Sequence, residues 1–499
     1  MPAGRVLESG CIDGRARSRE YRGIVLGLAL AGLSWSGAAF ADANQTAPVE
    51  ASSVSLGAAL GLLDAYSAAL NEDPGFAAAC YAREAGLESI KLGRAALLPS
   101  LSANYGIQRN QADVEFKNSF GTQSEDRDYQ STTGALQLRQ SLINAEGLAR
   151  YRQGRAETEA SEADYQAARL ELMTRVFTQY AEVNQAEVNL ALALAKREAL
   201  AEQRRTNDRL LAGGEGTVTD ALETQAQLDL AEAEVLAARD TVANSREALA
   251  RTVGQPVMAL VPLREDFIPA STPENSLTEW QSMAESSNPE LIAQRARVQV
   301  ATQEARRARA VRMPRLDLVA NLSQADSDTV STYEQNSLTR GVGVQFSMPL
   351  MAGGGISAEI RQKEALRKRE ESVLEAMTNE MFVNLQRQFN ATQSGRARIV
   401  ALGVSLESAR LLVTATEKSV VAGARTNLDV LQARQQWFAV RSELSLARYQ
   451  YLVAELGLRR AAGTLSETDL EAMARLFQIG VKPDPISQSG SMLWTSDAS

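Results

Sequence analysis

The sequence contains no histidine, two cysteines and few aromatic residues, and these absences narrow the classes of protein that it can encode. Of the 499 residues, 5% are aromatic and none is histidine. A chain without histidine has no Ser-His-Asp triad and no His-ligated metal. The sequence also has no nucleophile in a glycine-rich elbow. We therefore expect the protein not to be an enzyme, and we expect no cofactor and no bound metal ion.

An excess of positive charge and long apolar runs are also absent. The formal net charge is −9, so the chain is a poor ligand for nucleic acid. After the amino-terminal stretch, no segment has the continuous run of about 18 apolar residues that is expected of a membrane-spanning helix. If the chain crosses a membrane, the sequence predicts that it does so with strands.

The amino terminus has the pattern of a secretory signal peptide. Several arginines precede an apolar run from Gly23 to Leu33, and small residues then lead to Ala41. This order predicts that residues 1–41 are a signal peptide cleaved after Ala41, and that the protein is exported. An uncleaved membrane anchor is the alternative, but the apolar run is short for one. No cysteine directly follows the run, so lipid attachment there is not supported.

The rest of the chain contains two copies of one pattern. Pro74 recurs as Pro289 at an offset of 215 residues, and Gly214 recurs as Gly423 at an offset of 209. The matches keep the same order, and the offset changes only across polar segments, where insertions cost least. This order favours an internal duplication over chance. Further pairs are Pro99 with Pro314, Thr217 with Thr426, Asp220 with Asp429 and Gln227 with Gln436.

Each repeat has the same expected series of elements. The long helices of about 65 residues would span roughly 100 Å, which is far more than a compact domain requires. The first repeat, 42–257, is expected to have a helix near 54–95, a β-hairpin at about 97–143, a long helix over 147–211, a tip turn at 212–220 and a helix to 253. The second, 276–465, is expected to have a helix near 276–311, a β-hairpin at about 312–351, a long helix over 357–421, a tip turn at 422–429 and a helix to 458. Residues 258–275 are predicted to be a linker, and 466–499 a peripheral carboxy-terminal tail that begins with one short helix.

The expected strands alternate apolar and polar residues, as in the wall of a membrane barrel. The polar segments 109–133 and 324–341 are expected to be long outward-facing loops. Soluble hairpins that lie on a globular core are the alternative. The apolar positions are Leu101, Ala103, Tyr105 and Ile107 in the first strand, Leu136, Leu138 and Leu142 in the second, Leu316, Leu318, Ala320 and Leu322 in the third, and Val342, Val344, Phe346, Met348 and Leu350 in the fourth.

Four strands are too few to close a barrel. An open sheet edge in lipid leaves unpaired backbone groups that cost several kcal/mol each, and small transmembrane barrels have about eight strands. We therefore expect the chain to associate with copies of itself in outer-membrane lipid, and three copies would supply about twelve strands. The amphipathic long helices suit sideways packing in a wall. A coiled-coil rod would explain the helices but not the strand pairs.

Taken together, these features resemble the TolC family of outer-membrane efflux and secretion proteins. The resemblance extends over about 53–465 and is carried by Pro99 and Pro314 at the entries to the strands, and by the twin turns 214–220 and 423–431. It implies a mainly α fold with β-strands, in which each protomer has two repeats. Three such protomers would form a 12-stranded transmembrane β-barrel that continues into a 12-helix α-barrel tunnel through the periplasm.

The resemblance also implies a function and partners. The expected function is a passive channel of a tripartite export system, located in the cell outer membrane and extending into the periplasm. The expected partners are further copies of the chain in a homotrimer, a periplasmic adaptor (membrane fusion) protein and an inner-membrane ABC or proton-driven pump. The resemblance does not decide the cargo, which is either proteins, as in type I secretion, or small toxic molecules, as in efflux. The alternative function is a periplasmic coiled-coil adaptor or scaffold protein without a barrel.

In the family, the two turns form the periplasmic tip, where a polar network closes the entrance. Carried over by position, the candidate gate residues are Thr219 and Asp220 on the first turn, and Arg425 and Asp429 on the second. The resemblance implies that Arg425 bonds to the first turn and that Asp429 rings the pore mouth. Helix N-capping by the two aspartates is the plainer interpretation, and it does not exclude a role in the pore.

Two positions depart from the family pattern at this tip. Val420 stands where the best-known member has a tyrosine that helps to hold the tip closed. Gln432 stands where that member has a second pore-facing aspartate. The resemblance therefore leaves open whether the tip is closed at rest.

Overall fold

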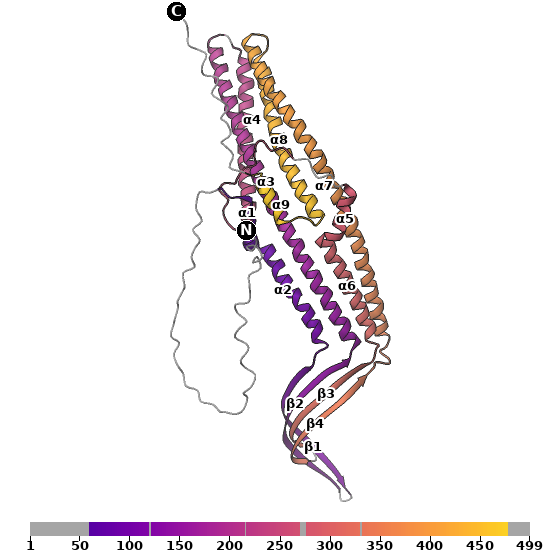
Figure 1. Cartoon of the computed structure of the whole chain (residues 1–499). Coiled ribbons are helices and arrows are strands. Elements are labelled where there is room, and N and C mark those ends of the chain that lie inside the picture. Colours follow the sequence, from indigo (N-terminus) through magenta and orange to yellow (C-terminus); the bar gives the residue numbers. More distant parts are fainter. Residues whose placement is uncertain (1–58, 119–120, 215, 270–275, 330–331, 478–499) are drawn as a thin grey trace, which may run out of the picture.

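The computed structural model describes residues 59–118, 121–214, 216–269, 276–329 and 332–477. The predicted signal peptide, 1–41, lies outside the described residues. Figure 1 shows an elongated molecule with a β-sheet at one end and two helical turns at the other, joined by long helices that run between them.

The sheet is antiparallel, with the strand order β1-β2-β3-β4. Its strands are β1 (Ser100–Asn118), β2 (Gly121–Ile143), β3 (Arg315–Thr329) and β4 (Thr332–Ser347). The hairpins of the two repeats thus pair through β2 and β3. The register places Leu138 opposite both Leu101 and Ala320, and Ala320 opposite Val342. One apolar row therefore crosses all four strands on the same face.

The prediction of long polar loops within the hairpins is wrong. Residues 109–118 and 121–133 are paired strand, and so are most of the residues in 324–341. A β-ladder is made by backbone groups, so polar side chains do not prevent it where both faces of the sheet are exposed. The polar composition instead marks the part of the hairpins that extends beyond the apolar rows.

The helices of the first repeat are α1 (Leu62–Glu72), α2 (Pro74–Ala95), α3 (Ala145–Ala212) and α4 (Val218–Val253). Those of the second are α5 (Leu277–Ser287), α6 (Pro289–Ala310), α7 (Gly355–Val421) and α8 (Asn427–Ala461), and α9 (Glu467–Ala474) follows. The sequence predicts one helix in place of α1 and α2, and one in place of α5 and α6. The structure divides both.

Each division falls at the residue before a proline. Proline lacks an N–H donor and disfavours helical angles in the preceding residue, so Asp73 and Asn288 are extended, with ψ of 115° and 118°. Each of these residues then caps the next helix. The Asp73 carboxylate accepts the N–H of Phe76 at 2.8 Å, and the Asn288 Oδ1 accepts that of Glu290 at 2.9 Å. The Asp-Pro and Asn-Pro pairs are therefore helix starts.

At each level along its axis, the protomer is a row of four elements. Next to the sheet the helical row is α2-α3-α6-α7, and towards the tip it is α4-α3-α8-α7. Among the described residues, the outer members of each row have a neighbour on one side only: β1 and β4 in the sheet, α2 and α7 in the middle, and α4 and α7 at the tip. The rows leave two free edges along the length of the protomer.

Glycine allows α2 and α3 to pack closely. A Cβ atom on Gly154 would lie 2.3 Å from the carbonyl oxygen of Ser89, and one on Gly93 would lie 2.8 Å from that of Arg150. Both distances are shorter than van der Waals contact, so these positions exclude a side chain. The two helix backbones therefore make direct contact next to the sheet.

The main hydrophobic core surrounds the middle of α3. Phe177 and Tyr180 have no exposed surface, and they pack with α1, the linker after α4, and α8. The Tyr180 hydroxyl accepts the N–H of Val261 at 3.1 Å and lies 2.9 Å from the carbonyl oxygen of the same residue and 3.0 Å from that of Leu60. Burial raises the pKa of Tyr180, so the hydroxyl stays protonated and can donate. The Tyr180 hydroxyl thus links the segment at Leu60 to the segment at Val261.

The predicted peripheral tail is part of this core. Leu470 and Met473 in α9, together with Phe477, are buried in it. The Phe477 ring meets the Tyr180 ring edge-on at 5.2 Å, and Phe477 forms an antiparallel bridge with Leu263. From sequence, the whole tail is expected at the periphery because its last residues are polar, although the segment before them is apolar. Residues 478–499 lie outside the described part of the chain.

Helix α7 is long and apolar enough to cross a membrane by composition. It has an 18-residue window with a mean hydropathy of 1.5, of which 17% is buried in the protomer. The apolar stretch 399–416 is interrupted by Glu407 and Arg410, which form an ion pair at 2.9 Å. This finding qualifies the expectation that only strands are apolar enough to meet lipid, and it raises the question of what covers α7.

Candidate functional site at the helical tip

The first tip turn joins α3 to α4. Gly214 has φ +78°, a left-handed conformation that a residue with a side chain seldom adopts. Thr217 then caps α4: its Oγ1 accepts the N–H of Asp220 at 3.1 Å and donates to the carboxylate of Asp220 at 2.6 Å. Beside this turn, the Asn207 amide in α3 donates to Thr224 Oγ1 in α4 at 2.8 Å, and both side chains are buried. This hydrogen bond connects α3 to α4 next to the turn.

The second tip turn, between α7 and α8, has the same construction. Gly423 has φ +71°. The Asp429 carboxylate accepts hydrogen bonds from the N–H and the hydroxyl of Thr426, both at 2.8 Å. These bonds, together with the charge of Arg425, hold the pKa of Asp429 below its usual value. Asp429 is therefore an ionised carboxylate at neutral pH.

The turns are shorter than the sequence predicts. Because α4 begins at Val218 and α8 at Asn427, Thr219 and Asp220 lie in the first turn of α4, and Asp429 lies in the first turn of α8. Within one chain, Arg425 lies beside Asp429, with Nη1 4.0 Å from the carboxylate, and its side chain is 53% exposed. The structure thus pairs Arg425 within its own turn. Asp429 accepts the N–H of Thr426 at the start of α8, as the plainer interpretation expects. In α4 the capping side chain is that of Thr217, and the Asp220 carboxylate accepts the Thr217 hydroxyl.

The pair Asn207 and Thr224 was missed by the sequence analysis. Both are polar residues with almost no exposed surface, at 3% and 0%, between two amphipathic helices. A polar residue at an inward position of the helical pattern was the available signal. It was hidden because Asn and Thr are also common on the solvent-facing side of helices.

Charges hold each helical hairpin together, whereas neutral groups connect the two hairpins. Lys196 of α3 pairs with Glu234 of α4 at 2.8 Å, and Arg434 of α8 pairs with Glu417 of α7 at 2.7 Å. Between the hairpins, the bonds are amide or hydroxyl contacts: Gln435 with Gln227 at 2.7 Å, Ser442 with Asn189 at 3.0 Å, and Ser445 with Gln185 at 3.1 Å.

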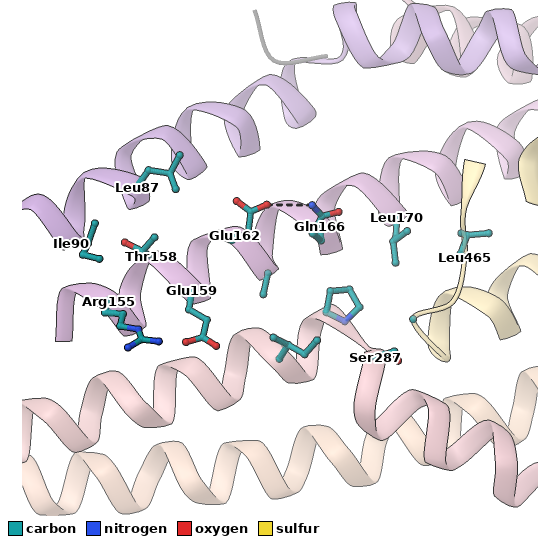
Figure 2. A pocket seen from close by; sticks show the side chains of 14 residues that line it. Leu87, Ile90, Arg155, Thr158, Glu159, Glu162, Gln166, Leu170, Ser287 and Leu465 are labelled. Carbon is teal, nitrogen blue, oxygen red and sulfur yellow. Dashed lines mark hydrogen bonds between the residues drawn. The ribbon is translucent and has the colours of Figure 1, made fainter. Parts of the chain in front are cut away.

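A groove of about 700 Å³ lies far from the tip, along α3 between α2 and the start of α6 (Figure 2). Leu87 of α2, Thr158 and Glu162 of α3, and Ser287 at the end of α5 are part of its lining. Figure 2 shows Glu162 accepting a hydrogen bond from Gln166 across one turn of α3. Thr158 donates to the Gly86 carbonyl oxygen of α2 at 2.9 Å, and Glu162 also pairs with Arg83 of α2, so these polar side chains connect α3 to α2.

At the other end of the molecule, the sheet presents its apolar face to the surroundings. Leu101 is 70% exposed and Val342 is 79% exposed, at opposite edges of one row. The rows run from Phe346 next to the helices to Tyr105 further out. Aromatic residues at both ends of an outward apolar band are typical of a transmembrane barrel wall. The fold and the two ends together define the protomer of a membrane channel built from two repeats.

The chain belongs to the outer membrane efflux protein family, whose model matches residues 65–255 and 280–464. It is 40% identical to the alkaline protease secretion protein AprF of Pseudomonas aeruginosa, over 85% of this chain and 89% of that protein. It is 38% identical to the proteases secretion protein PrtF of Dickeya chrysanthemi, over 84% and 92%. The crystal structure of the outer membrane protein VceC from Vibrio cholerae aligns with a TM-score of 0.70 and 19% identity, over 81% of this chain and 96% of that one.

Family membership confirms the channel function and the location. The protein is an export channel component in the outer membrane that extends into the periplasm. The two matched segments correspond to the two repeats. The alternative of an adaptor without a barrel has no support in these comparisons. The family consists of channels rather than enzymes.

Proposed function

We propose that three copies of this chain form the outer-membrane duct of a type I secretion system, which exports proteins. The observation that carries the proposal is the row of four elements with two free edges at every level. Backbone groups at the free edges of β1 and β4 need partners in lipid. Three copies joined edge to edge would give about twelve strands, which continue into about twelve helices.

The free edges of the helical rows support the same assembly. Val400, Val404 and Leu411 lie along α7 and are 51%, 67% and 58% exposed. On the opposite edge, Leu222 and Leu236 of α4 are 64% and 61% exposed. Apolar surfaces of this extent are seldom left in water. Packing of α7 against α4 of the next protomer would cover both, so the apolar stretch of α7 requires no membrane.

In this assembly, the tip residues would form the gate. Arg425 is half-exposed and has an ion-pair distance of 4.0 Å within its own turn, so its guanidinium retains donors for the first turn of a neighbouring protomer. Thr219 and Asp220 would be its partners there. Asp429, repeated in each protomer, would place a ring of carboxylates at the mouth. Exposed links of this kind contribute about 1 kcal/mol each, so they can close the mouth and still yield to an adaptor.

The cargo assignment is supported by the relatives. AprF and PrtF, which share 40% and 38% of aligned residues with this chain, are both named as protease secretion proteins. A secretion duct of this class would receive its cargo from an inner-membrane ABC pump through a periplasmic adaptor. We accordingly assign these two partners to the tip end of the molecule, where the duct would open into the periplasm.

Deletion of the gene, with plasmid complementation as the control, tests the cargo assignment. We expect the deletion strain to lose at least one protein from its culture supernatant and to keep its tolerance of toxic small molecules. The opposite pattern, with an unchanged supernatant and lost tolerance, would assign the duct to efflux. Purification in mild detergent tests the assembly separately: a stable monomer would contradict the edge-to-edge trimer.

A further inference from the structure

A buried carboxylate lies at the base of the sheet, where the strands meet the helices. Asp317 of β3 has a side chain that is 1% exposed. Its oxygens accept hydrogen bonds from Nε of Arg139 in β2 at 3.0 Å, from Nε of Arg315 at 3.0 Å and from the Ser141 hydroxyl at 2.8 Å. Nη2 of Arg139 also lies 2.7 Å from the carboxylate. One carboxylate thus holds two guanidinium groups, and the cluster carries a net positive charge.

Both arginines are bound to Asp317, but their side chains are still partly exposed. Their side chains are 42% exposed for Arg139 and 38% exposed for Arg315. A guanidinium has five N–H donors, and Asp317 with Ser141 uses only part of the two sets. Because the bonds to Asp317 already fix each arginine, the side chain would lose less entropy on meeting an anion.

The cluster lies on the polar face of the sheet. In β3, Asp317 alternates with the apolar residues Leu316 and Leu318, and Arg139 alternates with Leu138 in β2. The apolar face meets lipid, so in a closed barrel the polar face lines the lumen. This step depends on the assembly proposed above.

The rest of this face is uncharged over several rows. From the helices outward as far as the row of Gly106, the only charged residues at the described register positions of this face are Arg139, Arg315 and Asp317. Glu125 and Arg127 lie further out on the same face. The other positions are Ser100, Ser102, Asn104, Gly106, Thr133, Ala135, Gln137, Ser141, Val319, Asn321, Ser323, Ala325, Ser337, Thr339, Gly341, Gly343, Gln345 and Ser347. In a neutral lumen, a cluster of this charge determines the local potential.

We propose that Arg139 and Arg315 form an anion-attracting ring at the inner mouth of the barrel, and that Asp317 is the positioning residue that holds them. The ring favours anionic solutes and acidic segments of the exported chain as they leave the helical tunnel for the barrel. It has the opposite sign to the proposed carboxylate ring of Asp429 at the tip. The duct therefore selects at two places along its length, with opposite preferences.

Because the two rings are in series, the test uses an Asp429→Asn background. In planar bilayers with a KCl gradient, Arg139→Gln should lower the chloride-to-potassium permeability ratio by about twofold or more. It should also weaken block by oligoglutamate. Arg139→Lys is the matched control, because it keeps the charge and should keep the ratio. An unchanged ratio in Arg139→Gln, or an equal loss in Arg139→Lys, would overturn the ring.

Asp317→Asn provides an arm with the opposite sign. It removes the only negative charge of the cluster, so the ratio should rise if the arginines face the lumen. A solely structural role predicts a lower thermal midpoint in both Asp317→Asn and Arg139→Gln, with no opposite shifts in selectivity. If the assembly itself is wrong, the Asp429→Asn protein gives no channels, whereas failure of the ring alone leaves normal channels whose selectivity ignores these residues.

Discussion

Helices α3 and α7 are equivalent in the two repeats, yet the protomer treats them differently. They contain 68 and 67 residues. In α3, 18 residues are buried, whereas in α7 only six are. Helix α3 packs against α2, α4, α6 and α8, whereas α7 packs chiefly against α6 and α8. One helix is the centre of the protomer and the other is its edge.

The difference shows that a duplicated sequence need not produce duplicated environments. The rows of four elements place the first long helix second in its row and the second long helix last. Apolar residues of α3 therefore find partners in the same chain, whereas those of α7 depend on a neighbour. Stability of the protomer and stability of the assembly should accordingly respond to different helices.

The largest expected effect contrasts Val176 in α3 with Val404 in α7, which are 0% and 67% exposed. Val176→Asp buries an unpaired carboxylate, which costs several kcal/mol, so we expect little folded protein. Val404→Asp should leave the protomer folded, with unchanged helical circular dichroism, and should dissociate the trimer. Size exclusion in detergent gives the yield of folded protein, and light scattering gives its oligomeric state. A folded, trimeric Val404→Asp protein would remove α7 from the interface.

The next effect concerns the part of the tail that packs on α3, at 467–477. Phe477→Ala removes a ring that is 5% exposed and touches Tyr180 and Phe177. Deletions of buried aromatic rings cost about 3 to 5 kcal/mol, part of it from the cavity that is left. Thermal unfolding in detergent should show this loss. Leu63→Ala in α1, at 41% exposure, is the control and should change the midpoint little.

The sequence predicted the order of elements well, because the hydrophobic period is a local signal and the second repeat shows the same order of elements as the first. The helix breaks before Pro74 and Pro289 were missed, although the proline rule predicts them. The contribution of Phe477 to the core could not be predicted, since it depends on a bridge to Leu263 that is distant in sequence. Likewise, nothing in the alternation around Asp317 indicates that two arginines share its carboxylate.

A smaller effect compares an inner strand of the first repeat with an edge strand of the second. Leu138 of β2 and Phe346 of β4 lie on the same apolar face, 37% and 66% exposed in the single chain. Replacing either with Arg should cost about 2 to 4 kcal/mol if it faces lipid near the midplane, and less near the interface. Because Phe346 lies closer to the helices, we expect the smaller loss there. If refolding into lipid shows a negligible loss of folding free energy for both variants, the apolar face of the sheet does not meet lipid.

The smallest energies are expected at the two tip turns, which are alike in the two repeats. Removing the exposed link of Arg425 by Arg425→Ser should cost about 1 kcal/mol per protomer, which loosens the mouth without separating the trimer. Single-channel conductance in planar bilayers should rise. Asp220→Ala on the first turn should raise it too if the two residues bond across protomers. Unchanged conductance in both variants would place the gate elsewhere.

Asp429 needs a finer separation, because it caps α8 and would also line the mouth. Asp429→Asn keeps an oxygen that can accept the N–H of Thr426, so the cap survives while the charge is lost. Thr426→Ala does the reverse, because it removes the hydroxyl donor and leaves the carboxylate. If Asp429 rings the pore, Asp429→Asn should lower cation preference and relieve block by multivalent cations at nearly unchanged stability, whereas Thr426→Ala should cost about 1 kcal/mol and keep the preference. If both variants change only stability, Asp429 is a helix cap and the repeats are functionally alike at their tips.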